Sequence, residues 1–357
     1  MAITTDVSPI LSAISKLSDA EKVTMNQLIY KKYVEASSIT EIHPIIGGVQ
    51  CNTPIAKADR GNNWEYMQST AGLASQCEDT DDTISITYST KLWNPVPYAA
   101  SPEICFLNID CAIKDYFKSE GCSMADATGT QYADAILSVI GENIARSHWI
   151  KTWFADTSAT NTSFNGHDGL FVQMLAVATV VNTAQRREIT ENAEATKAAQ
   201  LALGATAALD TFQWMFDNQP DHLFGNPDLM ILASRTLCKN YLKWLQVNKQ
   251  VDCCERDPLT GVYNINNLSI YGIKIVMVKE WDEIILHVAD FDDGTVYDAP
   301  HRAVLTYGAN IPIGTCSTDE LDAFDVKYND YTQKTKFVTR YTFDAKVIED
   351  ADFLLAY

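Results

Sequence analysis

The chain has 357 residues, of which 46% are hydrophobic, and its formal net charge at pH 7 is −19. This apolar content excludes a disordered chain, and the length predicts about two domains. The acidic balance argues against sequence-specific binding to nucleic acid and against binding to anionic membranes, since both partners are negatively charged. Acidic residues are densest between residues 282 and 330, where eleven Asp and Glu accompany two basic residues. We therefore expect one strongly acidic region of surface.

No segment has the length and hydropathy of a membrane span. The most apolar stretch, residues 169–181, is shorter than the ~20 residues needed to cross a bilayer. The N-terminal segment has neither a basic start nor a long apolar run, which predicts no secretory signal. The nine cysteines show no zinc or redox spacing, so we interpret them as small apolar residues in a reducing cytoplasm.

The first part of the chain predicts a thin arm followed by a long loop. Residues 9–35 carry an imperfect apolar stripe of helical period. Residues 47–82 are rich in Gly, Pro, Asn and acidic residues, over a length that compact domains seldom leave as loop. We expect an extended excursion or two-stranded arm that carries Trp64 and Tyr66. A strand follows over residues 84–93, where apolar residues alternate with Ser and Thr.

Helical patterns dominate the middle of the chain. One helix is expected near residues 104–118 and a longer one over 131–153, which at ~1.5 Å per residue would be about 33 Å long. Residues 164–169 have turn chemistry and lead into another apolar helix. The alanine-rich residues 190–217 are predicted to be helical.

The last third of the chain turns to β-structure. A fully apolar strand, Asp228–Ala233, precedes a helix over Arg235–Val247. The later strands are expected over Leu268–Val278, Glu283–Ala289, Ala303–Ile313 and Lys334–Ile348. Because helices cluster in the middle and strands come late, the order predicts an α+β fold.

No motif for catalysis, cofactor binding or metal binding stands out. His167 lies beside Asp168, a pair that could orient an imidazole, but we interpret both as turn residues. The run from Asp290 to Gly294 departs from calcium-loop spacing, because its glycine is the fifth residue instead of the sixth. No glycine-rich phosphate loop and no Gly-x-Ser-x-Gly motif occurs. We predict no catalytic, cofactor-binding or metal-binding residues and a protein that is not an enzyme.

The order of the predicted elements resembles the major capsid protein of tailed bacteriophages, which has the Hong Kong 97-like fold. The segments that carry the resemblance are 84–97, 131–153, Phe164–Leu170, Ala207–Leu223, Asn226–Arg235 and Tyr271–Val276. The resemblance implies five regions: an N-terminal arm (1–46), an extended loop (47–83), a peripheral domain (84–189) with a spine helix (131–153), an axial domain (190–320) and a returning C-terminal strand region (321–357).

The resemblance also implies a function and its partners. Copies of the chain would assemble as hexamers and pentamers into the icosahedral head shell of a virion, built in the host cytoplasm around double-stranded DNA that the shell does not bind sequence-specifically. A portal and scaffold or decoration proteins are further partners, whereas no membrane is implied. The large aromatic residues are expected at assembly contacts, namely Trp64, Tyr66, Trp93, Trp149 and Trp153. Two alternatives remain: an encapsulin-type nanocompartment shell, and a soluble cytoplasmic α+β enzyme.

Overall fold

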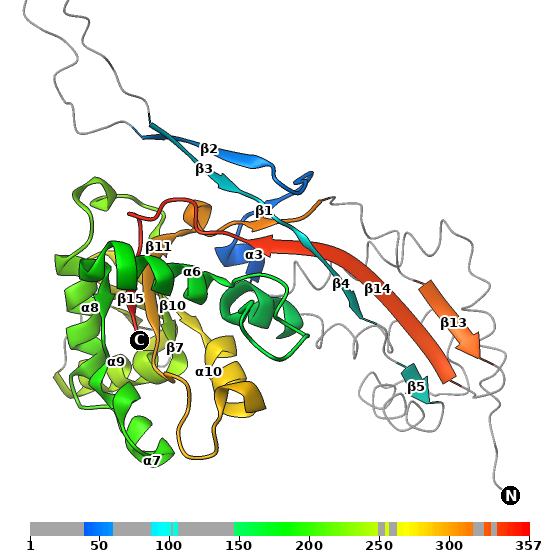
Figure 1. Cartoon of the computed structure of the whole chain (residues 1–357). Coiled ribbons are helices and arrows are strands. Elements are labelled where there is room, and N and C mark those ends of the chain that lie inside the picture. The colour runs from blue at the N-terminus through cyan, green and yellow to red at the C-terminus, as the bar shows by residue number, and fades with distance from the viewer. Residues whose placement is uncertain are drawn as a thin grey trace, which may run out of the picture.

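The computed structural model describes residues 39–59, 87–100, 103–105, 146–248, 254–256, 263–316, 325–329 and 334–357. In these ranges, two β-sheets share the C-terminal part of the chain, and a two-stranded ribbon projects from them (Figure 1). The ribbon pairs β2 (Pro54–Asp59) with β3 (Thr87–Leu92) in antiparallel register. The N-terminal arm before residue 39 and the stretch 60–86 lie outside the described residues.

The larger sheet has seven strands in the order β6-β15-β11-β7-β10-β9-β8. Its strands are β6 (Arg186–Arg187), β7 (Leu229–Ser234), β8 (Cys254–Arg256), β9 (Tyr263–Ile270), β10 (Ile273–Val278), β11 (Ala303–Tyr307) and β15 (Leu354–Ala356). Successive strand residues point to opposite faces. On β7, Ile231 and Ala233 therefore join one hydrophobic cluster and Leu232 joins another. Apolar residues on both faces explain why β7 has the continuous apolar sequence of a buried strand.

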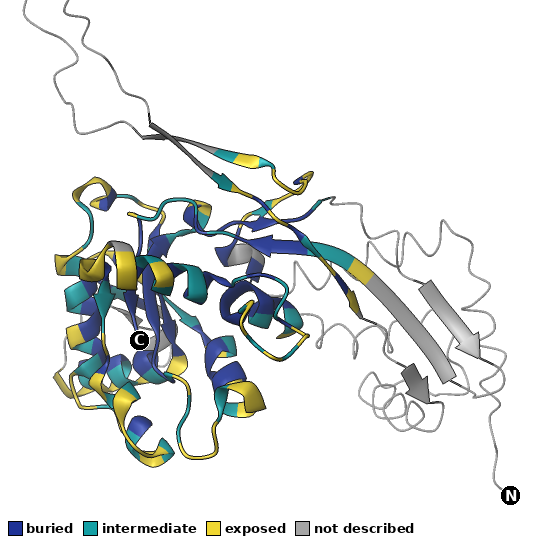
Figure 2. Ribbon diagram, in the orientation of Figure 1, coloured by how far each residue is buried: buried dark blue, intermediate teal, exposed yellow. Residues whose placement is uncertain are grey.

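Helices cover both faces of this sheet (Figures 1 and 2). They are α6 (Leu170–Ala176), α8 (Ala207–Asp217), α9 (Arg235–Asn248) and α10 (Lys279–His287), whereas the short α7 (Lys197–Gln200) lies at the lower end of the molecule in Figure 1. Helices α8 and α9 bury Phe212 and Tyr241 in the cluster of Ile231, whereas α6 and α10 bury Phe171 and Trp281 in the cluster of Leu232. Helices α8, α9 and α10 are amphipathic, so their polar sides remain in water.

The smaller sheet is built around one long strand. Its strands are β1 (Ile45–Ile46), β4 (Val96–Ala100), β5 (Glu103–Cys105), β12 (Ile313–Gly314), β13 (Asp325–Asn329) and β14 (Lys334–Ala345). β14 pairs with β4, β5, β12 and β13, and β1 adds to β12. The chain then crosses to β15 of the larger sheet, so one C-terminal segment ties the two sheets together.

Short helical segments and α3 complete the described part. They are α3 (Ile39–Ile42), η2 (Ile150–Phe154), η3 (Val177–Val181), η4 (Thr183–Gln185), η5 (Thr190–Ala193), η6 (Asp221–Leu223), η7 (Ala289–Phe291) and η8 (Gly308–Asn310). No helix in the described ranges is long and apolar enough to cross a bilayer.

Several predicted elements are confirmed. The predicted strand at Asp228–Ala233 is β7, and the helix after it is α9. The turn at 164–169 leads into α6 as expected. Residues 146–154 are helical, which confirms the C-terminal end of the predicted long helix, whose earlier residues lie outside the described ranges.

Other predicted elements are wrong. Glu283–Ala289 is mostly helical, as part of α10, because Trp281, Ile284 and Ile285 recur at helical spacing and are buried together. The predicted strand 268–278 is a hairpin, since the chain turns at Tyr271 and Gly272.

Two further boundaries are corrected. Residues 190–217 form η5, α7 and α8 instead of one helix, with Gly204 in the break. Residues 103–105, where a helix was expected to begin, form strand β5 on β14.

We predict that Gly314→Ala destabilises the fold. A Cβ atom at Gly314 would lie 2.6 Å from Cζ3 of the buried Trp93 ring, which must then shift. Overpacking of this kind costs about 1–3 kcal/mol of unfolding free energy, which chemical denaturation measures. Gly204→Ala is the matched control, because its Cβ would meet the tip of the Glu191 side chain at 3.2 Å and Ala207 Cβ at an ordinary contact distance of 4.0 Å. Equal stability of the two variants would contradict this packing.

Candidate assembly surfaces

The first strand of the ribbon, β2, lies within the predicted extended loop (47–83), and β3 follows that loop in sequence. Pairing runs from Pro54 opposite Leu92 to Asp59 opposite Thr87, so residues 60–86 leave and re-enter at neighbouring backbone positions. At its base, Trp93 N–H donates to Thr53 O and Asn52 N–H donates to Trp93 O. Backbone hydrogen bonds therefore join the two segments at the base of the ribbon, and the ribbon is not a separate domain.

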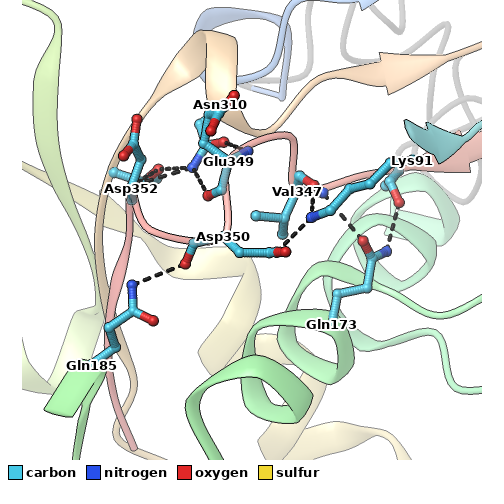
Figure 3. A network of polar contacts seen from close by, with 10 residues as sticks. Lys91, Gln173, Gln185, Asn310, Val347, Glu349, Asp350 and Asp352 are labelled. Atoms are coloured by element: carbon cyan, nitrogen blue, oxygen red, sulfur yellow. Dashed lines mark hydrogen bonds and ion pairs between the residues drawn. The ribbon is translucent and has the colours of Figure 1, made fainter. Parts of the chain in front are cut away.

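Lys91 ties this ribbon to the C-terminal connector (residues 346–353), which joins β14 to β15. Its Nζ donates to the Val347 carbonyl at 2.7 Å and pairs with Asp350 Oδ1 at 2.5 Å (Figure 3). Both side chains are partly exposed, so the ion pair itself is worth at most about 1 kcal/mol. Its main consequence is geometric, because it holds the base of the ribbon against the connector that runs from one sheet to the other.

Three amide side chains hold the rest of the connector (Figure 3). Gln173 of α6 donates to Ala345 O and accepts from Val347 N–H. Gln185 donates to the carbonyls of Asp350 and Phe353. Asn310 accepts from Glu349 N–H at 2.6 Å and donates to the Glu349 and Asp352 carbonyls. Backbone groups outside regular structure are thereby satisfied, and the connector has a defined path.

An exposed aromatic tip lies at one end of the larger sheet. It consists of Phe216 at the end of α8, Phe224 after η6, and Tyr271 in the β9–β10 turn. Phe224 is 69% and Tyr271 60% exposed, and the rings of Phe216 and Tyr271 are 4.4 Å apart. Tyr271 has φ of +49°, a left-handed conformation that a bulky residue adopts at an energetic cost. An exposed tyrosine in a strained turn contributes nothing to the core, which favours a role in contact with another molecule.

The predicted contact residues fall into two groups. Trp93, Trp149 and Trp153 are 4%, 2% and 0% exposed, and they pack within the described part of the chain. Trp93 lies against Gly314, and the Trp153 ring contacts Phe171 and Trp281. The structure therefore places these three indoles in the subunit core. Trp64 and Tyr66 lie outside the described residues, so their assembly role stays a prediction.

His167 and Asp168 do not form an orienting pair. A hydrogen bond of 2.7 Å joins Tyr98 Oη to His167 Nδ1, whereas Asp168 Oδ1 accepts from the backbone and hydroxyl of Thr157. The side chains thus serve two different elements, in agreement with the predicted turn role.

The acidic run near residue 290 is a turn, as predicted. Asp292 and Tyr297 form an antiparallel bridge, and Asp293 accepts from Thr295 and Val296 N–H. In the described part of the chain, no group of three metal-ligating residues gathers here or elsewhere.

Lys151 is a buried lysine that sequence reasoning did not single out. It is 7% exposed, its Nζ donates to the Tyr341 hydroxyl, and it lies 4.1 Å from the centre of the Tyr98 ring. Burial lowers the pKa of Lys151 to about 8. Cation–ring contacts compensate part of its desolvation, so the side chain joins η2 to the smaller sheet. The tip residues were also missed, because their role depends on neighbours far apart in sequence.

Comparison with known proteins identifies the fold. No protein-family model and no curated protein sequence matches the chain. In structure, the chain is similar to a chain of the satellite phage P4 procapsid including size determination (Sid) protein, with a TM-score of 0.51 and 11% identity, over 92% of this chain and 98% of that chain. The chain has a phage-capsid fold. The mixed α+β class and the resemblance to capsid proteins are thereby confirmed at the level of the fold.

Two other solved structures are similar at lower scores. The capsid of the native GTA particle gives a TM-score of 0.48 at 11% identity, over 90% of this chain and 89% of that chain. The holo-SrpI encapsulin complex of Synechococcus elongatus PCC 7942 gives 0.43 at 6% identity, over 89% and 85%. The assignment of a phage-capsid fold rests on the P4 procapsid match.

Buried histidines predict a loss of stability in acid. His43 Nδ1–H donates to Ile311 O while Nε2 accepts from Trp153 Nε1–H, so this ring is neutral. Burial lowers the pKa of His43 to about 4, that of His148 to about 3 and that of His167 to about 4. The unfolded chain takes up these protons near pH 6.5, so stability is full above that pH and falls as the pH drops toward 4. Burial raises the pKa of Asp282 to about 6, which offsets part of this loss.

The variant His148→Phe tests this linkage. The imidazole lies 4.8 Å from the Tyr341 ring and 5.4 Å from the Phe343 ring, so phenylalanine suits the site. We expect the pH dependence of the unfolding free energy between pH 6 and 4 to decrease by about 1.4 kcal/mol per pH unit, as one proton is removed from the linkage. An unchanged slope in denaturation series at several pH values would refute neutral burial of His148.

The aromatic tip is expected to affect assembly without supporting the fold. We predict that Phe224→Ser/Tyr271→Asn changes the unfolding free energy by less than about 0.5 kcal/mol, since both side chains are exposed and Asn tolerates positive φ. The concentration at which particles form should rise about tenfold or more, as light scattering measures. Val180→Ser removes an 82% exposed apolar side chain elsewhere and should change neither quantity.

Proposed function

We propose that the chain is the structural major capsid protein of a tailed phage and that copies of it assemble into an icosahedral head shell around double-stranded DNA. The observation that carries the proposal is the P4 procapsid match, which spans 92% of this chain and 98% of that chain. Similarity over nearly the whole of both chains supports a shared architecture instead of one shared domain.

The five-region layout expected from the sequence is part of this proposal. The β2–β3 ribbon supports an extended loop, because β2 lies within residues 47–83 and pairs with β3 just after them, which brings residues 59 and 87 together. The seven-stranded sheet, with α8 and α9, supports an axial domain, whereas the sheet around β14 supports a peripheral domain. The C-terminal region contributes β14 to one sheet and β15 to the other, as a returning strand region would.

Self-association explains features that contribute little to a lone subunit. The ribbon extends away from the body, and Leu92 and Ile46 near its base are 47% and 42% exposed (Figure 1). The aromatic tip adds a second exposed apolar surface on the larger sheet. Burial of such surfaces against neighbouring copies would give the large interfaces of an obligate assembly.

The remaining partners follow from the shell role. A net charge of −19 suits a shell that encloses DNA without binding it tightly, since like charges repel. A portal and scaffold or decoration proteins would complete the particle, which would be assembled in the host cytoplasm and reside in the virion. The role is structural, with no catalytic step and no cofactor.

Closing the ribbon by a short turn tests the function. We predict that replacing residues 60–86 by Asn-Gly leaves a folded subunit, because Asp59 and Thr87 are directly paired and a two-residue turn can join them. This variant should keep its unfolding transition but sediment as a small species under conditions where the full chain forms particles. Normal particles from the variant would overturn the proposed role of the loop, and particles that contain enzyme cargo instead of DNA would favour a nanocompartment.

A further inference from the structure

An acidic groove runs beside strand β6 of the larger sheet. Two cavities of about 440 Å³ and 930 Å³ form it, and they share Asp290, Phe291, Asp298 and Tyr357 among their lining residues. The floor of the smaller cavity is aromatic, with Phe154 and Phe171 beneath the buried Arg302. This floor offers apolar surface for the methylene stem of a long charged side chain, while the rim offers negative charge.

The rim holds more carboxylates than its basic residues neutralise. Three of the carboxylates form ion pairs with described residues: Asp298 with Arg302, Glu188 with Arg186, and Asp292 with Lys197. Glu194, Asp290 and Asp293 also line the groove and are exposed. None of the last three forms an ion pair with a described residue, so the groove presents uncompensated negative charge.

Helix α9 presents the opposite charge on another surface. Its buried side consists of Leu237, Cys238, Tyr241 and Leu245. Its exposed side carries Arg235, Lys239 and Lys243, spaced four residues apart and therefore on one stripe. These three side chains form no ion pair with another described residue. Among the described residues, this stripe is a local concentration of positive charge on a chain of net charge −19.

The groove and the stripe lie on different sides of the larger sheet. The aromatic floor belongs to the cluster that includes Leu232, whereas α9 packs into the cluster that includes Ile231, on the opposite face. The groove also lies at the β6 edge, and α9 lies over β7, β10 and β9 toward the other edge. One subunit can therefore use its groove toward one neighbour and its stripe toward another.

We propose that the acidic groove of one subunit binds the basic stripe of α9 from a second copy of this chain. A contact between two different surfaces is heterologous, and when its rotation closes it produces a ring. The inference rests on the proposed shell function and deepens it by naming the surfaces that join neighbours within a ring. Complementary charge would set the register and speed assembly, and high salt would weaken the contact.

Charge reversal on each surface tests the contact. Lys239→Glu/Lys243→Glu places acid on the stripe, and Glu194→Lys/Asp290→Lys places base on the groove. Both changes lie at exposed side chains, of which Asp290 accepts a hydrogen bond from Asn161 Nδ2, and Asp293 is spared because it holds its turn. Each variant alone should associate at least about tenfold more weakly than the unaltered chain in sedimentation velocity, because like charges then face each other. Lys274→Glu/Lys279→Glu makes the same charge change at exposed lysines outside the stripe and should associate normally.

Mixing the two variants gives the decisive result. The acidic stripe of Lys239→Glu/Lys243→Glu can pair with the basic groove of Glu194→Lys/Asp290→Lys. The unaltered basic stripe of the second variant can likewise pair with the unaltered acidic groove of the first. An equimolar mixture should therefore regain association, and its rings should alternate and contain an even number of subunits. The fourfold variant, which carries all four changes in one chain, should regain rings of every size. Failure of the mixture to associate would overturn the proposed contact.

The two levels of the proposal fail in different ways. If the unaltered chain forms shells and neither charge-reversed variant is weakened, the groove-to-stripe contact is wrong while the shell function stands. If the unaltered chain stays monomeric at every concentration and salt tested, the shell function fails, and the contact fails with it.

Discussion

The burial of Trp153 is the interaction on which the described structure depends. Its indole is fully buried, donates to His43 Nε2 of the segment after α3, and contacts Phe171 of α6 and Trp281 of α10. Its backbone also lies against Gly169, where a Cβ atom would be 2.8 Å away. One side chain from η2 thus joins the start of the described chain to helices on the larger sheet. Since α6 and α10 cover one face of that sheet, this packing holds η2 and the segment after α3 against the larger sheet.

A second constraint is the C-terminal connector, which the two sheets share. The side-chain amides of Gln173, Gln185 and Asn310 hydrogen-bond to its backbone, and Lys91 joins it to the base of the ribbon. The exposed ribbon is therefore held by the same segment that carries the chain into β15. The described part of the chain thus combines two packed sheets with a ribbon that extends from them, which suits the proposed role in a shell.

Sequence periodicity correctly predicted the elements whose buried face is set by the apolar pattern of their own residues. Strand β7 and helix α9 follow directly from their apolar patterns, because β7 is a continuous apolar run and the buried residues of α9, namely Leu237, Cys238, Tyr241 and Leu245, recur at helical spacing. Helix α10 was predicted in part as a strand, since Glu283–Ala289 is rich in β-branched residues. Tertiary packing of Trp281, Ile284 and Ile285 outweighed that propensity. Three buried indoles were expected at contacts between copies, because large aromatic residues are common there: Trp93, Trp149 and Trp153. The sequence contained no indication that Gly314 would pack against Trp93 or that His43 would lie beside Trp149.

The central claim is that this chain is a shell subunit, and electron microscopy of the purified, overexpressed chain tests it most directly. The account predicts closed shells, or rings with rotational symmetry, in images of material whose mass is measured by light scattering. A small closed dimer or tetramer that never assembles further under crowding or altered salt would contradict the account and favour a soluble enzyme.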